Sequence, residues 1–241
     1  MIAMAKTQQI VIVGAGGFAR EVFQAVRLYN ERKAEEEPTY ECIGFLSDHP
    51  DDLDNFSGCP PIIGPIHGYT PDSRLRYILG IGQPKYRYLI ASLFKSSWDL
   101  FPPFAFRYGW QRGLNRFAHL ASTNVQFASG SCLLAINVSC DIKIGNFALV
   151  NTPYSLGHDV VIGDFCEVGP MCALGGRTVL EEGVHLAAGV VTAPGVRIGA
   201  WSKVAAGSTV MKNVPPGSFV IGVPGKVNKE FFLPYDGLAL S

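Results

Sequence analysis

His158 and Asp159 are the adjacent pair in this 241-residue chain whose types best suit proton transfer. An unperturbed imidazole has a pKa of ~6.5, so it can accept a proton near neutral pH. A carboxylate on the second ring nitrogen would fix the tautomer and stabilise the imidazolium. We therefore expect a general base at His158, oriented by Asp159. The alternative is a solvated histidine on a turn.

A glycine loop, Gly14-Ala15-Gly16-Gly17, follows the β-rich run 10–13 and precedes a helical stretch. Its spacing fits the GxGxxG/A fingerprint, in which glycines let the backbone approach phosphate and the helix N-terminus favours an anion. Arg20 adds a positive charge in the first helical turn. Three interpretations stay open: a nucleotide-diphosphate site, a site for another anion, or a tight turn only.

Metal chemistry is not indicated. Of the five histidines at positions 49, 67, 119, 158 and 185, only the last two fall in the repeats described below, and neither forms an HxxxxH pattern. The cysteines at 42, 59, 132, 140, 166 and 172 include no CxxC pair. We expect no bound metal and free cysteines that mostly act as small apolar residues.

The elements that position these residues fall into two unlike parts. Residues 1–100 alternate expected strands (10–13, 40–46 and 77–81) with expected helices (18–33 and 84–94), which predicts a parallel sheet in a Rossmann-like α/β nucleotide-binding domain. Residues 101–124 read as an aromatic-rich linker that contains His119, which we take as structural.

The remainder of the chain repeats every six residues. Stepping by six from Val138 to Val210 meets an aliphatic residue at every position except Thr192. One hexad makes a short strand and a turn, and three hexads close a coil of 18 residues whose backbone pairs with the next coil. The period predicts a parallel β-helix over 125–218. The N-terminal domain would cap one end and residues 219–241 the other.

Composition bounds the function. Lys plus Arg and Asp plus Glu are 20 each, so the net charge is zero and gives no sign of nucleic-acid binding. No apolar run approaches the ~20 residues that cross a bilayer, and the first nine residues lack the apolar stretch of a signal peptide. We expect a cytoplasmic protein with no membrane insertion.

Several segments carry a family resemblance. They are 11–17 (VIVGAGG), 44–48 (GFLSD), 79–82 (LGIG), Asn151-Thr152 with His158-Asp159, and 221–226 (IGVPGK). With the hexads, they resemble the PglD/NeuD group of hexapeptide-repeat sugar acetyltransferases. The resemblance implies a left-handed parallel β-helix, a homotrimer with active sites between neighbouring prisms, and acetyl-CoA and a nucleotide-activated sugar as substrates.

The resemblance also implies roles for individual residues. Substrate contacts would come from the glycine loop and its surroundings: Gly14, Gly16, Gly17 and Arg20 at the diphosphate, Asp48 near the base or ribose, and Gly82 and Asn151. Catalysis would use His158, Asp159 in place of the family's Glu, and the Gly176 N–H as an oxyanion donor. Coenzyme A would lie against Glu167, Ala188, Ala206 and Lys226.

Plainer interpretations stand beside these roles. Gly176 also suits any corner, Asn151 also suits a turn cap, and the alanines also suit any hexad. Glu167 stands where PglD-type enzymes carry a second histidine. It either alters contacts with the acyl donor or acceptor, or is an ordinary surface residue.

The function that these patterns favour is acetyl-CoA-dependent N-acetylation of a nucleotide-linked amino sugar, with a UDP-linked 4-amino sugar expected, in surface glycan biosynthesis. O-acetylation of a sugar or a sialic acid is the alternative enzyme function. A third hypothesis is a non-enzymatic scaffold, against which the His158-Asp159 pair argues.

Overall fold

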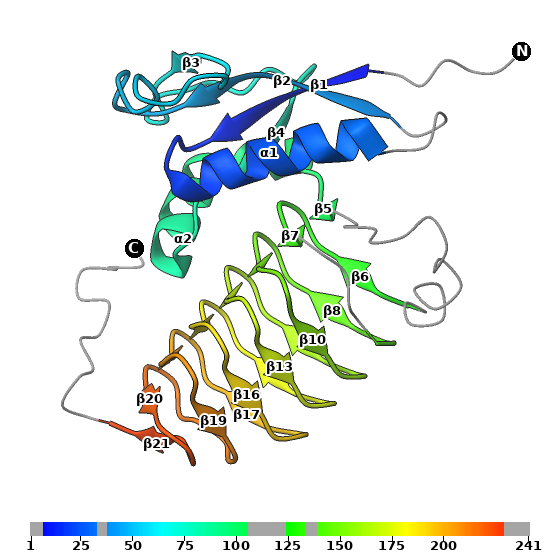
Figure 1. The fold of residues 1–241 in the computed structure, drawn as a ribbon, viewed down its shortest axis with the longest axis vertical. Coiled ribbons are helices and arrows are strands. Elements are labelled where there is room, and N and C mark those ends of the chain that lie inside the picture. The colour runs from blue at the N-terminus through cyan, green and yellow to red at the C-terminus, as the bar shows by residue number, and fades with distance from the viewer. Residues whose placement is uncertain (1–6, 33–37, 106–123, 134–138, 229–241) are drawn as a thin grey trace, which may run out of the picture.

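The computed structural model describes residues 7–32, 38–105, 124–133 and 139–228. An α/β domain sits on one end of a tapering stack of coils (Figure 1). Both parts agree with the fold class predicted from the sequence. His119, Val138 and most of the expected linker lie outside the described residues.

The N-terminal domain is a parallel sheet, sheet 1, in the order β3-β2-β1-β4. Its elements are β1 (Thr7–Val13), α1 (Gly17–Arg32), β2 (Thr39–Leu46), β3 (Ile62–Gly64), β4 (Arg76–Leu79), α2 (Pro84–Leu93) and the 3₁₀ helix η1 (Lys95–Leu100). The expected strands and helices are present. β3 and η1 were not predicted, and the third expected strand ends at Leu79 rather than residue 81.

The second part is a left-handed parallel β-helix with three sheets. Sheet 2 contains β5 (Phe104–Ala105), β7 (Cys132–Leu133), β9 (Leu149–Val150), β12 (Glu167–Val168), β15 (His185–Leu186), β18 (Lys203–Val204), β20 (Phe219–Ile221) and β21 (Lys226–Val227). Sheet 3 contains β10 (Ser155–Leu156), β13 (Ala173–Leu174), β16 (Val191–Thr192) and β19 (Thr209–Val210). Sheet 4 contains β6 (Gln126–Phe127), β8 (Lys143–Ile144), β11 (Val161–Ile162), β14 (Val179–Leu180) and β17 (Arg197–Ile198).

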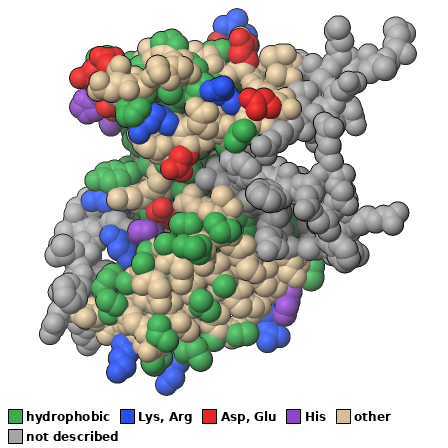
Figure 2. Space-filling view, in the orientation of Figure 1, with side chains coloured by type: hydrophobic (Ala, Val, Ile, Leu, Met, Phe, Trp, Pro, Cys, Tyr) green, Lys and Arg blue, Asp and Glu red, His purple; other side chains and the backbone are tan. Residues whose placement is uncertain are grey.

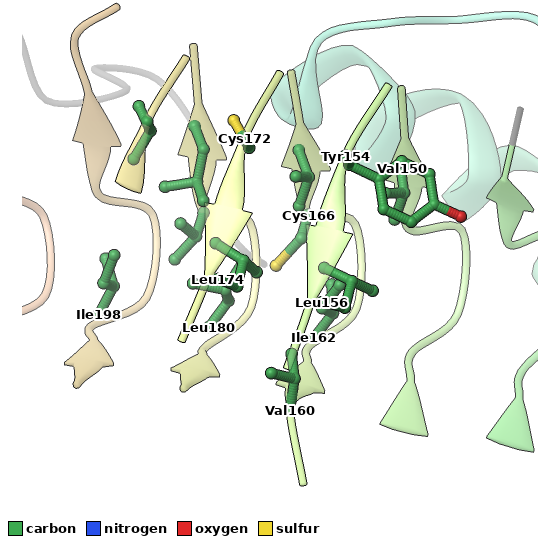
Figure 3. Packing of buried hydrophobic residues seen from close by; sticks show 14 of the residues in the cluster. Val150, Tyr154, Leu156, Val160, Ile162, Cys166, Cys172, Leu174, Leu180 and Ile198 are labelled. Atoms are coloured by element: carbon green, nitrogen blue, oxygen red, sulfur yellow. The ribbon is translucent and has the colours of Figure 1, made fainter. Parts of the chain in front are cut away.

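The hexad register accounts for the core. Strand partners such as Glu167 and His185 are 18 residues apart, as three hexads per coil require. The aliphatic residue of each hexad points inward, where Leu156, Leu174 and their neighbours stack in layers (Figure 3). Thr192, the exception in the pattern, is also buried, and its hydroxyl lies 2.8 Å from the hydroxyl of Thr178. This hydrogen bond satisfies both polar groups inside an apolar core.

The ends of the β-helix differ from the expected boundaries. β5, placed in the linker by the sequence, pairs with β7 and extends sheet 2. β20 pairs in parallel with β18, so residues 219–221 continue the stack instead of beginning a separate cap. Among the strands that the structure describes, β21 alone breaks the parallel pattern, because it folds back antiparallel on β20.

The two parts share buried side chains. Residues of α1 and sheet 1 form one apolar cluster with Phe104, Cys132 and Leu149 of sheet 2. Residues of β1, β4 and α2 form a second cluster with Phe147 and Phe165 of the β-helix. Their rings stack in parallel with centroids 6.0 Å apart. The N-terminal domain is therefore packed onto the first coils of the β-helix.

Candidate active site

His158 lies on the corner between sheets 3 and 4, two residues after β10 ends. Its side chain is about half exposed, as the hexad position predicts, with 52% of its surface accessible. Nδ1 lies 2.7 Å from Oδ2 of Asp159, which leaves Nε2 as the outward-facing nitrogen. Asp159 adopts φ +58°, a left-handed conformation that Asp tolerates better than most residues. The Asp159 carboxylate therefore holds the His158 ring in one orientation.

Gly176 lies directly beside this ring, one coil further along the chain. A Cβ built on Gly176 would stand 2.5 Å from Nε2 of His158, so only glycine leaves room for the imidazole. The two turns are also tied together, because Arg177 N–H donates to the His158 carbonyl at 2.7 Å. The structure brings His158, Asp159 and Gly176 together, as the resemblance implied.

The glycine loop forms a tight turn between β1 and α1. Gly14 adopts φ +104°, and a Cβ there would come within 2.7 Å of Ile81, so this position requires glycine. Gly16 and Gly17 are exposed at the start of α1, whose first turn holds no acidic residue. This leaves the positive end of the helix dipole open to an anion.

Arg20 and Asp48 are engaged within the N-terminal domain. The Arg20 guanidinium carbon lies 3.5 Å from the ring centroid of Phe56, which holds the charge near the glycine loop. Asp48 accepts hydrogen bonds at 3.0 Å from the N–H groups of Ile66 and His67 and lies 2.7 Å from His67 Nδ1. These hydrogen bonds, first that from the His67 N–H, lower the pKa of Asp48. Both carboxylate oxygens thus hold a loop, and a ligand contact by Asp48 stays a prediction.

A cavity of about 360 Å³ opens where the two parts meet. We call it the seam cavity; it is lined by Phe18, Glu21, Gly82, Leu149, Asn151, Thr152, Glu167 and Pro170. Acidic, basic and histidine side chains are all visible at the constriction between the two parts (Figure 2). Of the predicted site residues, the structure places Gly82, Asn151 and Glu167 together here.

Glu167 is a largely buried carboxylate in this cavity, with 16% of its side chain accessible. Burial raises its pKa to about 7, although the nearby positive charge of Arg87 acts to lower it. His185, its partner on β15, places Nε2 3.4 Å from Glu167 Oε2, yet no hydrogen bond satisfies that oxygen among the described residues. Burial and Lys203 lower the pKa of His185, so its neutral form faces the carboxylate near pH 7.

Arg87 is a residue that the sequence did not single out. It is fully buried on α2, and its Nε donates to the Phe147 carbonyl at 2.6 Å while Nη1 donates to the Ile81 carbonyl. Burial lowers its pKa to about 10, so it stays charged at neutral pH. The sequence signal that could have indicated its burial is its place on the apolar face of a predicted helix. Phe18 and Glu21 of α1, just past the glycine loop, were also missed.

Small residues form a column below the seam cavity. Gly189 N–H donates to the Pro170 carbonyl and Gly207 N–H to the Ala188 carbonyl, so Pro170, Ala188 and Ala206 stack on the corner between sheets 2 and 3. Lys226 lies on the last strand of sheet 2, at the end of the β-helix far from the N-terminal domain (Figure 1). Of the predicted coenzyme residues, Ala188 and Ala206 thus share this corner, whereas Glu167 and Lys226 lie on strands of sheet 2.

His158 and the seam cavity lie on different corners of the β-helix. His158 is on the corner between sheets 3 and 4, whereas Asn151, Pro170 and Ala188 follow the corner between sheets 2 and 3. His158 is not among the residues that line the seam cavity.

Within the described ranges, no group of three or more His, Cys, Asp or Glu side chains could hold a metal ion. No helix that the structure describes is long and apolar enough to cross a membrane.

Solved structures share this architecture across nearly the whole chain. A mutant perosamine N-acetyltransferase from Caulobacter crescentus, in complex with CoA and GDP-perosamine, is 24% identical with a TM-score of 0.67, covering 91% of this chain and 96% of that one. WeeI from Acinetobacter baumannii is 23% identical with a TM-score of 0.66, over 92% of this chain and 100% of that one. The acetyltransferase domain of PglB from Neisseria gonorrhoeae, in complex with acetyl coenzyme A, is 19% identical with a TM-score of 0.65, over 92% and 100%.

Curated relatives match shorter segments. A galactoside O-acetyltransferase from Lactococcus lactis is 45% identical over 60 residues, which cover 23% of this chain and 29% of that protein. A UDP-3-O-acylglucosamine N-acyltransferase from Methylobacterium nodulans is 34% identical over 94 residues, which cover 39% of this chain and 27% of that protein. This chain thus spans less than a third of the length of either relative.

A family model matches the N-terminal domain. Residues 9–94 match the PglD N-terminal domain family, which agrees with the glycine loop and with the strand order of sheet 1. The chain therefore combines a segment that matches the PglD N-terminal domain with a left-handed parallel β-helix, and its fold is shared with the solved acetyltransferase structures above.

Proposed function

We propose that this protein transfers an acetyl group from acetyl-CoA to an amino sugar carried on a nucleotide diphosphate. The observation that carries the proposal is the position of the seam cavity. It lies between Phe18, just past the glycine loop on α1, and the corner column that continues through Ala188. A diphosphate at the start of α1 would direct its sugar into the cavity, and a thioester lying along the column would meet it there.

The chemistry assigns a role to each group near His158. The amine nitrogen attacks the thioester carbonyl carbon, and Nε2 of His158 accepts the proton that the nitrogen loses. Asp159 holds the ring so that Nε2 faces outward. Gly176 N–H donates to the oxyanion of the tetrahedral intermediate. The imidazolium then protonates the departing thiolate of coenzyme A.

This reaction requires a second copy of the chain. His158 and the seam cavity lie on different corners, separated by sheet 3, so one chain does not assemble the site. The outward residues of sheet 3 are uncharged, as a packed interface between prisms would favour: Ser155, Ala173, Val191 and Thr209. In the homotrimer that we propose, one copy supplies His158 and its neighbour supplies the cavity.

The test is release of coenzyme A thiol from acetyl-CoA in the presence of UDP-, GDP- and dTDP-linked 4-amino sugars. We expect turnover with at least one, and a loss of about 10³-fold in kcat for His158→Asn. Stability of the product to mild alkali separates an amide from an ester. An ester product would replace this proposal with O-acetylation, and absence of thiol release from a folded trimer with every acceptor would remove it.

The assembly has its own test. Mixing His158→Asn chains with chains in which Gly82→Trp fills the seam cavity should restore activity, because a mixed trimer contains some intact sites. Failure of all such mixtures, with subunit exchange verified by mass spectrometry, would place the complete site within one chain and contradict the shared arrangement.

A further inference from the structure

Glu167 is the buried ionisable side chain of the seam cavity that the reaction above does not use. It projects from the outward face of β12 toward the end of β4 and α2, where a Cβ on Gly82 would lie 3.9 Å from its Oε1. Its Oε2 is buried and has no hydrogen-bond partner among the described residues. A buried acceptor in a ligand-sized cavity is costly unless a donor arrives with the ligand.

Titratable groups lie near Glu167, with His185 Nε2 at 3.4 Å, but among the described residues none donates a hydrogen bond to its buried Oε2. On α2, Nε and Nη1 of Arg87 donate to the Phe147 and Ile81 carbonyls, whereas its buried Nη2 has no hydrogen-bond partner among the described residues. The charge of Arg87 acts on Glu167 without a hydrogen bond between them. On β15, His185 is held toward its neutral form by burial and by Lys203. On α1, Glu21 adds a second carboxylate to the wall. The residues lining the cavity therefore include two carboxylates and no Lys, Arg or His.

We propose that Glu167 selects an amine over a hydroxyl on the acceptor sugar, by binding the ammonium form and accepting one proton from it. This inference rests on the proposed function and names the feature of the substrate that the cavity recognises. A sugar hydroxyl in the same place would donate a hydrogen bond but would bring no charge to compensate the buried carboxylate. Charge-assisted hydrogen bonds are the stronger class.

The proton balance gives the two bases separate tasks. The ammonium nitrogen gives its first proton to the Glu167 carboxylate, which leaves a neutral amine with a free electron pair. That pair attacks the thioester carbonyl carbon, and the second proton goes to His158 of the neighbouring copy. Coenzyme A leaves as the thiol, and the carboxyl group later returns its proton to water. A carboxyl group with a pKa of about 7 is near enough in pKa to an ammonium group to accept its proton.

Binding measured without acetyl-CoA separates recognition from turnover. Titration calorimetry would compare UDP- and GDP-linked 4-amino sugars with their 4-hydroxy counterparts on the wild type. We expect the amine to bind at least about tenfold more tightly, as a hydrogen bond to a charged group allows. Glu167→Gln keeps the size and one carbonyl acceptor but removes the charge and replaces the second oxygen by an amide donor. It should lose this preference while binding the hydroxyl form within about twofold of the wild type.

Two further variants locate the effect. Glu182→Gln removes a carboxylate from the turn after β14, outside the seam cavity, and should keep the preference. Glu21→Gln tests the second carboxylate of the wall, and loss of the preference there alone would overturn the assignment to Glu167. Equal binding of amine and hydroxyl forms to the wild type would also overturn it.

The failures of the two proposals differ. If no nucleotide sugar binds the wild type, the proposed function itself fails. If the amino sugar binds and is acetylated but Glu167→Gln keeps both the preference and kcat, only the role of Glu167 fails.

Discussion

Replacing Glu167 by Gln should change how the stability of this protein depends on pH. Burial raises the carboxyl pKa from 4.5 to about 7, so folding favours the protonated form. The contribution of this group to stability is fully present below pH 4.5 and is lost as the pH rises through 7. The shift of roughly 2.5 units corresponds to a loss of about 3 kcal/mol well above pH 7.

The loss is spread over a defined window. With these two pKa values, the penalty on the wild type grows by about 2 kcal/mol between pH 5.5 and 8.5. Gln carries no charge, so the free energy of unfolding of Glu167→Gln, relative to the wild type, should rise by about 2 kcal/mol over the same pH range. Arg87 stays charged throughout, because its pKa is about 10. The comparison therefore isolates the carboxyl group, apart from His185.

Urea unfolding at both pH values, without ligand, measures the difference between wild type and variant. Since the pKa of His185 is lowered, its contribution to stability decreases as the pH falls. This trend is opposite to that of Glu167. Repeating the measurement in a His185→Gln background removes that effect. A wild-type minus variant difference that stays constant within about 0.5 kcal/mol across the window would refute the burial argument.

Four other substitutions test the geometry. Gly176→Ala should displace the His158 ring, since its Cβ would stand 2.5 Å from Nε2; thiol release should fall by at least about tenfold while the melting temperature changes little. Gly169→Ala would bring a Cβ within 2.8 Å of a backbone oxygen in the next coil and should cost about 3 kcal/mol in urea unfolding. Gly195→Ala, with open space around it but φ +75°, should cost only about 1 kcal/mol, and equal costs would contradict the coil-packing argument. Arg87→Met should leave two buried carbonyls unpaired and cost about 3 kcal/mol, with faster proteolysis between the two parts as a second readout; unchanged unfolding and proteolysis would remove its bridging role.

Local sequence pattern determines the β-helix, the glycine turn and the exposed position of His158. The hexad register from Ile144 to Val210 specifies the β-helix because each aliphatic residue must be buried every sixth position. The glycine spacing at 14–17 specifies a turn between strand and helix for the same local reason. The position of His158 two residues past an inward residue likewise predicted its exposed corner. Each of these predictions depends on neighbours within one coil or one turn.

The burial of Glu167 and Arg87 could not be read in the same way. On sequence grounds Glu167 was equally an ordinary surface residue, because the outward face of sheet 2 is normally open to water. It is buried because α1, α2 and the β4 end pack over that face, through contacts between segments some 60 residues apart, such as Arg87 with Phe147. The sequence by itself determined the two folds and the oriented imidazole. Only the tertiary structure decided where the domains meet, and therefore which carboxylate lost its water and which corner of the prism lies apart from the cavity.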